Sequence, residues 1–279
     1  MRPARVLRRA ADYLARHDVE SPLPTAEILL ATVLGTDRAG LYARDEGLSA
    51  ADARLFGRSL CRRCAGIPLQ HITGAQAFRR LMLTVKPGVF IPRPETEILV
   101  EHALAAIADT PVPVVVDVGT GTGAVALAVK DERRDACVWA IDVSPPAVEL
   151  ARENAGRLGL DVEVVEGDML DAVPPALRGT VDLVVSNPPY IPAAEVPALA
   201  REVRADPASA LVGGIDVFDR LFAQASGVLR CGGAVVVEIG ATQGGPVTAA
   251  AARAGFVRVR THLDLTGRDR VVSGWAGVA

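Results

Sequence analysis

The 279-residue sequence has few aromatic residues and no long hydrophobic run. Its longest apolar stretches are strand-length pieces such as Val112 to Val116 and Ala234 to Val237, far short of the roughly 20 residues that span a bilayer. Aromatic residues make up 4% of the chain, so base-stacking platforms for single-stranded nucleic acid are difficult to assemble. We therefore expect neither a membrane role nor direct nucleic-acid binding.

Cysteine is also scarce, and its placement excludes a disulfide framework. The four cysteines, Cys61, Cys64, Cys137 and Cys231, have no framework spacing and are typical of a reducing cytoplasm. Cys61 and Cys64 form a lone C-x-x-C without the second pair that a tetrahedral zinc site needs. We expect a cytoplasmic protein with ordinary thiols and no metal site.

The formal net charge of -3 is unevenly distributed along the chain. Residues 1–80 carry 13 Lys and Arg against 8 Asp and Glu, whereas residues 81–279 carry 17 against 25. The basic part either presents solvated helix faces or docks an anionic partner surface. Arg54, Arg58, Arg62 and Arg63 recur along one predicted helix and are the candidate docking face.

Residues 1–75 are predicted to form a small helical domain. Thr25 can cap a helix that Gly35 would end, and Ser49 with Asp52 resembles the start of a helix running to Cys64. Residues 76–110 follow as a connector, with a hairpin around the polar Arg79-Arg80 pair and a helix beginning at Pro94.

Residues 111–279 show a different pattern, in which apolar strands and helices alternate. This alternation, with Val-rich strands that are apolar on both faces, predicts an α/β domain with a mostly parallel sheet covered by helices on both sides. The expected strands are 112–118, 138–142, 162–166, 181–186, 234–239, 256–261 and 270–275.

A glycine-rich loop follows the first of these strands and indicates a nucleotide-type cofactor. It consists of Gly119, Thr120, Gly121, Thr122 and Gly123, at the edge of the sheet where ligands bind. The glycines also fit the dinucleotide pattern. Asp117 favours S-adenosylmethionine over a dinucleotide, because a carboxylate repels the pyrophosphate of a dinucleotide but suits the ammonium group of S-adenosylmethionine.

Asp142 ends the next strand, where a carboxylate can accept hydrogen bonds from both hydroxyls of an adenosine ribose. Nicotinamide enzymes use the same device, so Asp142 indicates adenosine without selecting a cofactor. The alternative for such an aspartate after a strand is a helix-capping role.

The most specific motif is Ser186-Asn187-Pro188-Pro189-Tyr190, after the strand at 181–186. A planar amide or amino nitrogen attacks a methyl sulfonium only when it is held in line and acceptors bind its N–H groups. The Asn187 side-chain oxygen and the Pro188 carbonyl can hold such an NH2 group, and Tyr190 can stack on it. No Ser/His/Asp triad accompanies the motif. We therefore predict a nitrogen methyltransferase.

These motifs together resemble the HemK/PrmC family of peptide-chain release factor glutamine-N5 methyltransferases. The resemblance extends over nearly the whole chain. It rests on Pro68 to Gly74, Phe90 to Glu97, Gly119 to Gly123, Asn187 to Ile191, Glu238 to Gly240 with Gln243, and Gly267 to Arg270.

The resemblance implies a Rossmann-like class I methyltransferase fold with a seven-stranded, mostly parallel sheet, a small N-terminal helical domain and a connecting β-hairpin. It also implies that the helical domain, residues 1–75, docks the substrate. It implies transfer of a methyl group from S-adenosylmethionine to the glutamine side chain of the Gly-Gly-Gln motif. The cofactor contacts would fall on Gly119 to Gly123, Asp142, Met169 and Asn187, and the glutamine site on Asn187 to Tyr190. In methyltransferases of this fold, the position of Asp168 commonly contacts the adenine amino group.

Three other functions compete with this interpretation. An adenine-N6 nucleic-acid methyltransferase could use the same Asn-Pro-Pro-Tyr motif, but it must extrude a base and hold phosphates, which an acidic catalytic part disfavours. A dehydrogenase is disfavoured by Asp117 and by the lack of a catalytic base. A silent cofactor-binding protein is disfavoured by the intact motif.

Overall fold

The computed structural model describes residues 3–277, which form two compact units. The first comprises the chain up to Ala75 together with Ala200–Ala205, and the second comprises Gln76–Leu199 and Asp206–Ala279. The segment Ala200–Ala205 is far in the sequence from the rest of the first unit, and it lies between two parts of the second unit. No local sequence pattern predicted that it belongs to the first unit.

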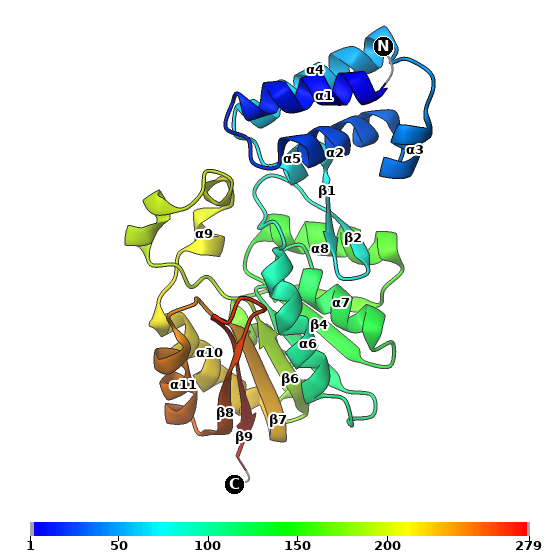
Figure 1. Cartoon of the computed structure of the whole chain (residues 1–279). Helices are drawn as coiled ribbons and strands as arrows, with labels where there is room; N and C mark the ends of the chain where they lie inside the picture. The colour runs from blue at the N-terminus through cyan, green and yellow to red at the C-terminus, as the bar shows by residue number, and fades with distance from the viewer. Residues whose placement is uncertain (1–2, 278–279) are drawn as a thin grey trace. The chain divides into compact units, whose positions relative to one another are not determined.

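The first unit, called here the helical unit, has five α-helices in its described residues, together with the short 3-10 turn η5 (Val203–Ala205) (Figure 1). The α-helices are α1 (Pro3–Ala15), α2 (Pro22–Leu34), α3 (Arg38–Ala43), α4 (Ala50–Cys64) and α5 (Leu69–Thr73). Their core includes Leu7, Leu14, Leu30, Leu41 and Phe56.

Two of the predicted helix boundaries in this unit are confirmed and one is wrong. The Ser49 hydroxyl accepts a hydrogen bond from Asp52 N at 3.1 Å and caps α4, and Gly35 ends α2 with a φ of 60°. Thr25, however, lies inside α2, which begins three residues earlier at Pro22. Proline fits the first helical turn, where its missing N–H has no partner to lose.

Arg63 does not belong to a solvent-facing basic surface, contrary to the sequence prediction. Its side chain is buried, forms an ion pair with Glu202 and donates to the Ile67 carbonyl at 3.3 Å. Arg54, Arg58 and Arg62 are exposed. Helical spacing placed all four on one helix, but a partner from a distant segment covers Arg63.

The second unit, called here the catalytic unit, begins with the predicted hairpin and connector helix. Strands β1 (Ala75–Phe78) and β2 (Leu81–Thr84) are joined by a turn in which Arg79 has a φ of 51°. The Arg79 guanidinium binds Glu132 through two hydrogen bonds, which holds this turn against the domain. A short 3-10 turn, η1 (Pro94–Thr96), then leads into α6 (Glu97–Ala106).

A seven-stranded sheet forms the centre of this unit, as predicted, with the order β5-β4-β3-β6-β7-β9-β8. The first five strands in this order are parallel, and β9 is antiparallel to both of its neighbours. The strands are β3 (Val114–Val118), β4 (Cys137–Asp142), β5 (Val162–Glu166), β6 (Val181–Ser186), β7 (Leu229–Glu238), β8 (Phe256–Leu263) and β9 (Asp269–Ala276).

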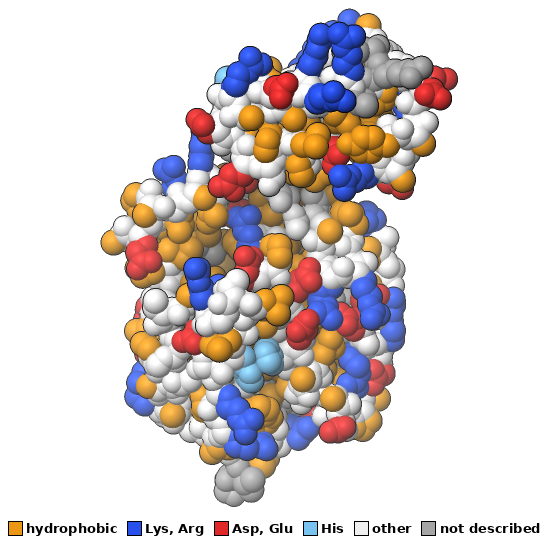
Figure 2. Space-filling model, in the orientation of Figure 1, with side chains coloured by type: hydrophobic (Ala, Val, Ile, Leu, Met, Phe, Trp, Pro, Cys, Tyr) orange, Lys and Arg blue, Asp and Glu red, His pale blue; other side chains and the backbone are white. Residues whose placement is uncertain are grey.

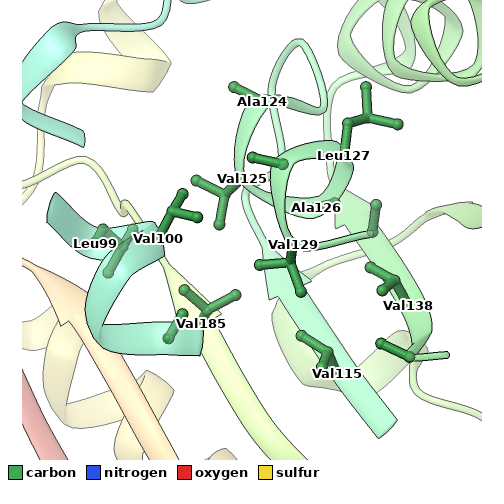
Figure 3. Packing of buried hydrophobic residues seen from close by; sticks show 14 of the residues in the cluster. Leu99, Val100, Val115, Ala124, Val125, Ala126, Leu127, Val129, Val138 and Val185 are labelled. Atoms are coloured by element: carbon green, nitrogen blue, oxygen red, sulfur yellow. The ribbon is translucent and has the colours of Figure 1, made fainter. Parts of the chain in front are cut away.

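Helices cover both faces of the sheet because successive strand residues point to opposite sides. Val115 belongs to a buried cluster with residues of α6, α7 (Ala124–Glu132) and α8 (Pro145–Leu158), and Figure 3 shows Val129 of α7 next to it. Val116 packs on the other face with α10 (Ile215–Val228) and α11 (Gly244–Arg253). The predicted two-sided α/β architecture is confirmed.

The connections after β5 and β6 have little regular structure. Short turns η2 (Met169–Ala172) and η3 (Pro175–Leu177) follow β5. After β6 come η4 (Ala193–Ala198), η5 (Val203–Ala205) and α9 (Ala208–Leu211). No helix in the part of the chain that the structure describes is long and apolar enough to cross a membrane.

Candidate functional site

A cavity of about 270 Å³ lies in the catalytic unit at the carboxyl ends of β3, β4 and β6. It brings together every predicted site residue except one: Asp117, Gly119, Thr120, Gly121, Thr122, Asp142, Asp168, Met169, Asn187, Pro188, Pro189 and Tyr190. Gly123 does not line the cavity. With a φ of 84° it forms the turn into α7, where a Cβ would press on Leu127.

Asp117 lies at the floor of this cavity and is 1% exposed. Its Oδ2 accepts hydrogen bonds from the Thr120 hydroxyl at 2.6 Å and from Ala126 N at 3.1 Å. Its Oδ1 accepts no hydrogen bond from residues 3–277. Burial raises the pKa of Asp117 to about 7, against the opposing effect of the two hydrogen bonds. The carboxylate thus combines a capping role at α7 with one oxygen left over for a cationic ligand.

The glycine-rich loop, Gly119 to Gly123, is held in place by backbone hydrogen bonds. Gly119 N and Thr120 N both donate to the Ile141 carbonyl, at 2.8 and 3.0 Å. Gly119 has a φ of 72° and Gly121 a φ of 57°, a region that side chains rarely adopt. These positions explain the glycine-rich sequence, because the loop turns back onto β4.

Asp142 at the end of β4 connects this loop to the next one. Its Oδ2 accepts from Gly121 N at 2.8 Å, and its Oδ1 accepts from Ser144 N at 2.9 Å. Burial raises its pKa, and these backbone hydrogen bonds oppose the shift. Each carboxylate oxygen keeps a second lone pair, so the side chain can accept two further hydrogen bonds from a ligand.

Asp168 and Met169 lie after β5 in a more open part of the cavity. The Asp168 carboxylate is exposed, and its Oδ2 pairs with Arg220 Nη2 at 2.8 Å. Met169 is half-buried and has a φ of 52°, an unusual conformation for a side chain of its size. The structure therefore places both residues at the cavity but assigns one Asp168 oxygen to an ion pair that the sequence did not indicate.

The Asn187 side chain is oriented by a residue from the connector. Its Nδ2 donates to Thr96 Oγ1 at 3.1 Å, and Thr96 is buried. The amide nitrogen is thus bound within the protein, and the amide oxygen, Oδ1, has no hydrogen-bond partner among the described residues. An acceptor is therefore available at the cavity, as the sequence argument required.

Tyr190, the last residue of the motif, is held at two points. Its hydroxyl donates to Glu238 Oε1 at 3.1 Å, and its carbonyl accepts from Gln243 Nε2 at 2.9 Å. Burial raises the pKa of Tyr190, and the neighbouring Glu238 charge acts in the same direction. Tyr190 consequently remains a neutral phenol whose ring position is fixed.

The backbone of the motif is clamped by the segment that precedes α10. Ile191 N donates to the Leu211 carbonyl at 2.9 Å, and Gly213 N donates to the Ile191 carbonyl at 3.0 Å. A Cβ at Gly213 would collide with the Pro189 carbonyl oxygen. This close approach requires glycine and keeps the two prolines in one conformation.

Several cavity residues were not identified as site residues from the sequence. Phe90, Pro92 and Thr96 line the cavity but were noted only as part of a family-specific segment. Buried Asn154 on α8 was missed entirely. Its Nδ2 donates to the Thr122 carbonyl and to the Thr84 carbonyl, both at 3.0 Å, so it joins the cofactor loop to the hairpin. A polar residue at an apolar helix position was the only available signal.

None of the four cysteines lines this cavity. Cys61, Cys137 and Cys231 are exposed, Cys64 is half-buried, and all four are free thiols. No group of three or more His, Cys, Asp or Glu side chains within residues 3–277 is arranged to hold a metal ion.

The methyltransferase small domain family matches residues 81–250, so fold and site together define this chain as a Rossmann-like methyltransferase. The structure of a Thermus thermophilus 16S rRNA N2 G1207 methyltransferase, solved with AdoMet and guanosine, has a similar fold. It is 19% identical with a TM-score of 0.53, and the match covers 72% of this chain and 49% of that one.

Two further comparisons identify the family. The PrmC N-terminal domain matches residues 5–74. The release factor glutamine methyltransferase of Moorella thermoacetica is 41% identical, over 95% of both chains. That of Deinococcus radiodurans is 42% identical, over 96% of both chains. The chain belongs to the release factor glutamine methyltransferase family.

Proposed function

We propose that this enzyme transfers a methyl group from S-adenosylmethionine to the side-chain amide nitrogen of the Gly-Gly-Gln glutamine in peptide-chain release factors. The observation that carries the proposal is the orientation of Asn187, whose amide nitrogen is bound by Thr96 while its oxygen stays available at the cavity. The names of the curated relatives support the same substrate.

The residues on the β3 and β4 side of the cavity fit the cofactor. Asp117 would hold its ammonium through Oδ1, and Asp142 would accept the two ribose hydroxyls. Met169 would lie against the adenine ring, with Asp168 at the exocyclic amino group. When bound there, S-adenosylmethionine supplies an electrophilic methyl group on a sulfonium.

The residues after β6 fit a planar primary amide. Asn187 Oδ1 and the Pro188 carbonyl, which accepts no hydrogen bond from the described part of the chain, would each accept one N–H of the glutamine. The nitrogen lone pair is delocalised, so holding both N–H groups is what fixes its direction of attack. Tyr190 would stack on the amide plane.

The helical unit would dock the release factor. Figure 2 shows Lys and Arg side chains spread over the visible face of this unit, with hydrophobic side chains between them. Leu23, Ile28, Tyr42 and Leu55 of this unit are exposed large hydrophobic residues. Such a mixture suits a protein partner of opposite charge. A substrate of this kind would place the reaction in the cytoplasm.

Adenine-N6 methylation of nucleic acid is not favoured. Relatives that share about two fifths of their residues over nearly the full length carry the release-factor name. The acidic balance of residues 81–279 also opposes a phosphate backbone.

The test is a methyl-transfer assay with labelled S-adenosylmethionine and three parallel acceptors: a release factor, duplex DNA and tRNA. The matched control is the same release factor with the Gly-Gly-Gln glutamine replaced by glutamate, which keeps the shape but removes the NH2 group. We expect label only in the intact release factor, located by mass spectrometry on that glutamine. Label in nucleic acid, or in the control protein, would overturn the proposal.

A further inference from the structure

We propose that Thr96 and Glu238 are positioning residues that set the orientation of the Asn187 amide, so that its oxygen rather than its nitrogen faces the substrate. The expected effects on turnover rest on the proposed function, whereas the orientation of the Asn187 amide can be measured without substrate. The three residues come from the connector, from the end of β7 and from the loop after β6.

The side chains of Thr96 and Glu238 are both buried, and Thr96 contacts Asn187. Asn187 Nδ2 donates to Thr96 Oγ1 at 3.1 Å, and the Thr96 side chain is 3% exposed. Glu238 is also 3% exposed; burial raises the pKa of its carboxylate, and the Thr96 hydroxyl opposes the shift. Glu238 Oε1 accepts from the Tyr190 hydroxyl, whereas the buried Oε2 has no hydrogen-bond partner within residues 3–277 and is the acceptor toward which the Thr96 hydroxyl can turn.

The direction of these hydrogen bonds follows from what each group can donate. An ionised carboxylate only accepts, so in this proposal the partnerless Oε2 of Glu238 is the acceptor for the single hydroxyl proton of Thr96. The Thr96 oxygen can then only accept from its second neighbour, Asn187. Asn187 must therefore turn its NH2 group toward Thr96 and its carbonyl oxygen away from it.

The opposite orientation would defeat the reaction. If the Asn187 NH2 faced the cavity, it would oppose the NH2 of the target glutamine, donor against donor. Burial raises the pKa of Glu238 only to about 6, so the group is ionised above neutral pH. Glu238 also binds Tyr190, so one carboxylate orients both polar side chains of the motif.

A purely structural role for Glu238 makes a different prediction, because it would lower stability without changing turnover. Glu27 in the helical unit is a suitable control. It is another buried carboxylate that binds a tyrosine hydroxyl, that of Tyr42, and it also pairs with Arg38. It lies outside the cavity, so Glu27→Gln removes a similar charge without touching the proposed hydrogen bonds.

The kinetic experiment compares Thr96→Val, Thr96→Ser, Glu238→Gln and Glu27→Gln at pH 8, with saturating S-adenosylmethionine and release factor. Valine keeps the shape of threonine but can neither accept nor donate, whereas serine keeps the hydroxyl. We expect kcat to fall roughly ten- to a hundredfold in Thr96→Val and Glu238→Gln, less than for removal of Asn187 itself. Thr96→Ser should rescue most of the loss relative to valine, and Glu27→Gln should keep the wild-type kcat.

A second measurement needs no substrate. In protein labelled with 15N-asparagine, the Asn187 side-chain NH2 signals are those that disappear in Asn187→Ala. We expect slow exchange of one NH2 proton with water in the wild type, Thr96→Ser and Glu27→Gln, and fast exchange in Thr96→Val and Glu238→Gln.

The two measurements separate the possible failures. A wild-type enzyme that methylates no release factor contradicts the proposed function, while the NH2 exchange still tests the orientation. Unchanged exchange and unchanged kcat in folded Thr96→Val and Glu238→Gln would overturn the positioning role. Equal losses of kcat in Glu238→Gln and Glu27→Gln would also overturn it, because the effect would then be one of stability alone.

Discussion

The two sides of the cavity are built differently, although both follow parallel strands. On the cofactor side, Asp117 and Asp142 are bound by backbone groups and a hydroxyl that lie at most 21 residues away in the sequence. On the substrate side, Asn187 is bound by Thr96, 91 residues away, and Tyr190 by Glu238 and Gln243, 48 and 53 residues away. The two aspartates are therefore supported by nearby residues, whereas the motif that contains Asn187 and Tyr190 depends on contacts from distant parts of the chain.

This difference has an energetic consequence that mutation can test. Replacing a carboxylate that only nearby residues support should remove its own contacts to the ligand and leave other residues unaffected. A residue in a long-range network should affect its neighbours as well, so that effects within the network are not additive. The following predictions apply this contrast, from the largest expected effect to the smallest.

Replacing Asn187 should cause the largest loss. Asn187→Ala removes one of two acceptors for the target NH2 group, and kcat should fall roughly a hundred- to a thousandfold, about 3 to 4 kcal/mol of transition-state stabilisation. Cofactor affinity should change far less, because Asp117 and Asp142 are untouched. Single-turnover kinetics and calorimetry measure the two quantities separately.

Asn187→Asp sharpens this result. It keeps an acceptor and nearly the same shape but cannot donate to Thr96. If accepting the substrate N–H groups is the essential role, the aspartate variant should be more active than the alanine variant. Full single-turnover activity in Asn187→Ala with an intact fold would show that the motif is only a stiff turn.

Asp142→Ala should act on the cofactor alone. The lost pair of charge-assisted hydrogen bonds is worth about 1.5 to 3 kcal/mol, so the Kd for S-adenosylmethionine should rise roughly ten- to a hundredfold. Asp161 is exposed, and Asp161→Ala serves as the matched control. Unchanged calorimetric affinity in folded Asp142→Ala would remove this residue from the site.

Asp117 should make cofactor binding depend on pH. Its pKa of about 7 in the free protein would be lowered by a bound ammonium, so binding favours the charged form and affinity rises with pH through this range. Between pH 6.0 and 7.5 the Kd should fall roughly fivefold, below the pH at which an α-amino group loses its own proton. Asp117→Asn should flatten this profile. A wild-type profile as flat as that of the variant would contradict the ammonium contact.

The smallest effect should come from the exposed arginines of the helical unit. Reversing Arg54 and Arg58 to glutamate should slow association with the release factor about two- to tenfold at low salt and weaken its salt dependence. Cofactor affinity should stay constant. Arg178→Glu, an exposed change in the catalytic unit, is the control. If methylation of intact release factor at low salt is the same in all variants, these arginines form only a solvated face.

The sequence allowed most of the secondary structure to be predicted because its signals are local. Val162 to Glu166 and Val181 to Ser186 were predicted with the bounds that the structure shows. The central strand β6 is buried at every position and is a mostly apolar run, whereas the edge strand β5 is recognisable by its valines, with Glu163 and Glu166 exposed. The start of α2 was wrong because Thr25 is a good capping residue wherever it occurs, and only packing decides whether it is used.

The site residues also divide into those that local sequence identifies and those whose role depends on distant partners. The glycines, the aspartates after strands and the Asn-Pro-Pro-Tyr motif are recognisable from the sequence, because residue type and spacing define their local geometry. Thr96 and Glu238 appear in recognisable segments, but nothing local relates either of them to Asn187. Asn154 and the Arg63–Glu202 pair were unpredictable for the same reason.

The sequence by itself therefore determined the order of elements, the glycine-rich loop and the Asn-Pro-Pro-Tyr motif, whose Asn187 we propose holds the substrate amide. Only the tertiary structure decided which way the Asn187 side-chain amide faces and which charged side chains are buried. The physical reason is that backbone turns and strand periodicity depend on near neighbours, whereas the direction of a buried hydrogen bond depends on partners that folding brings together from distant parts of the chain.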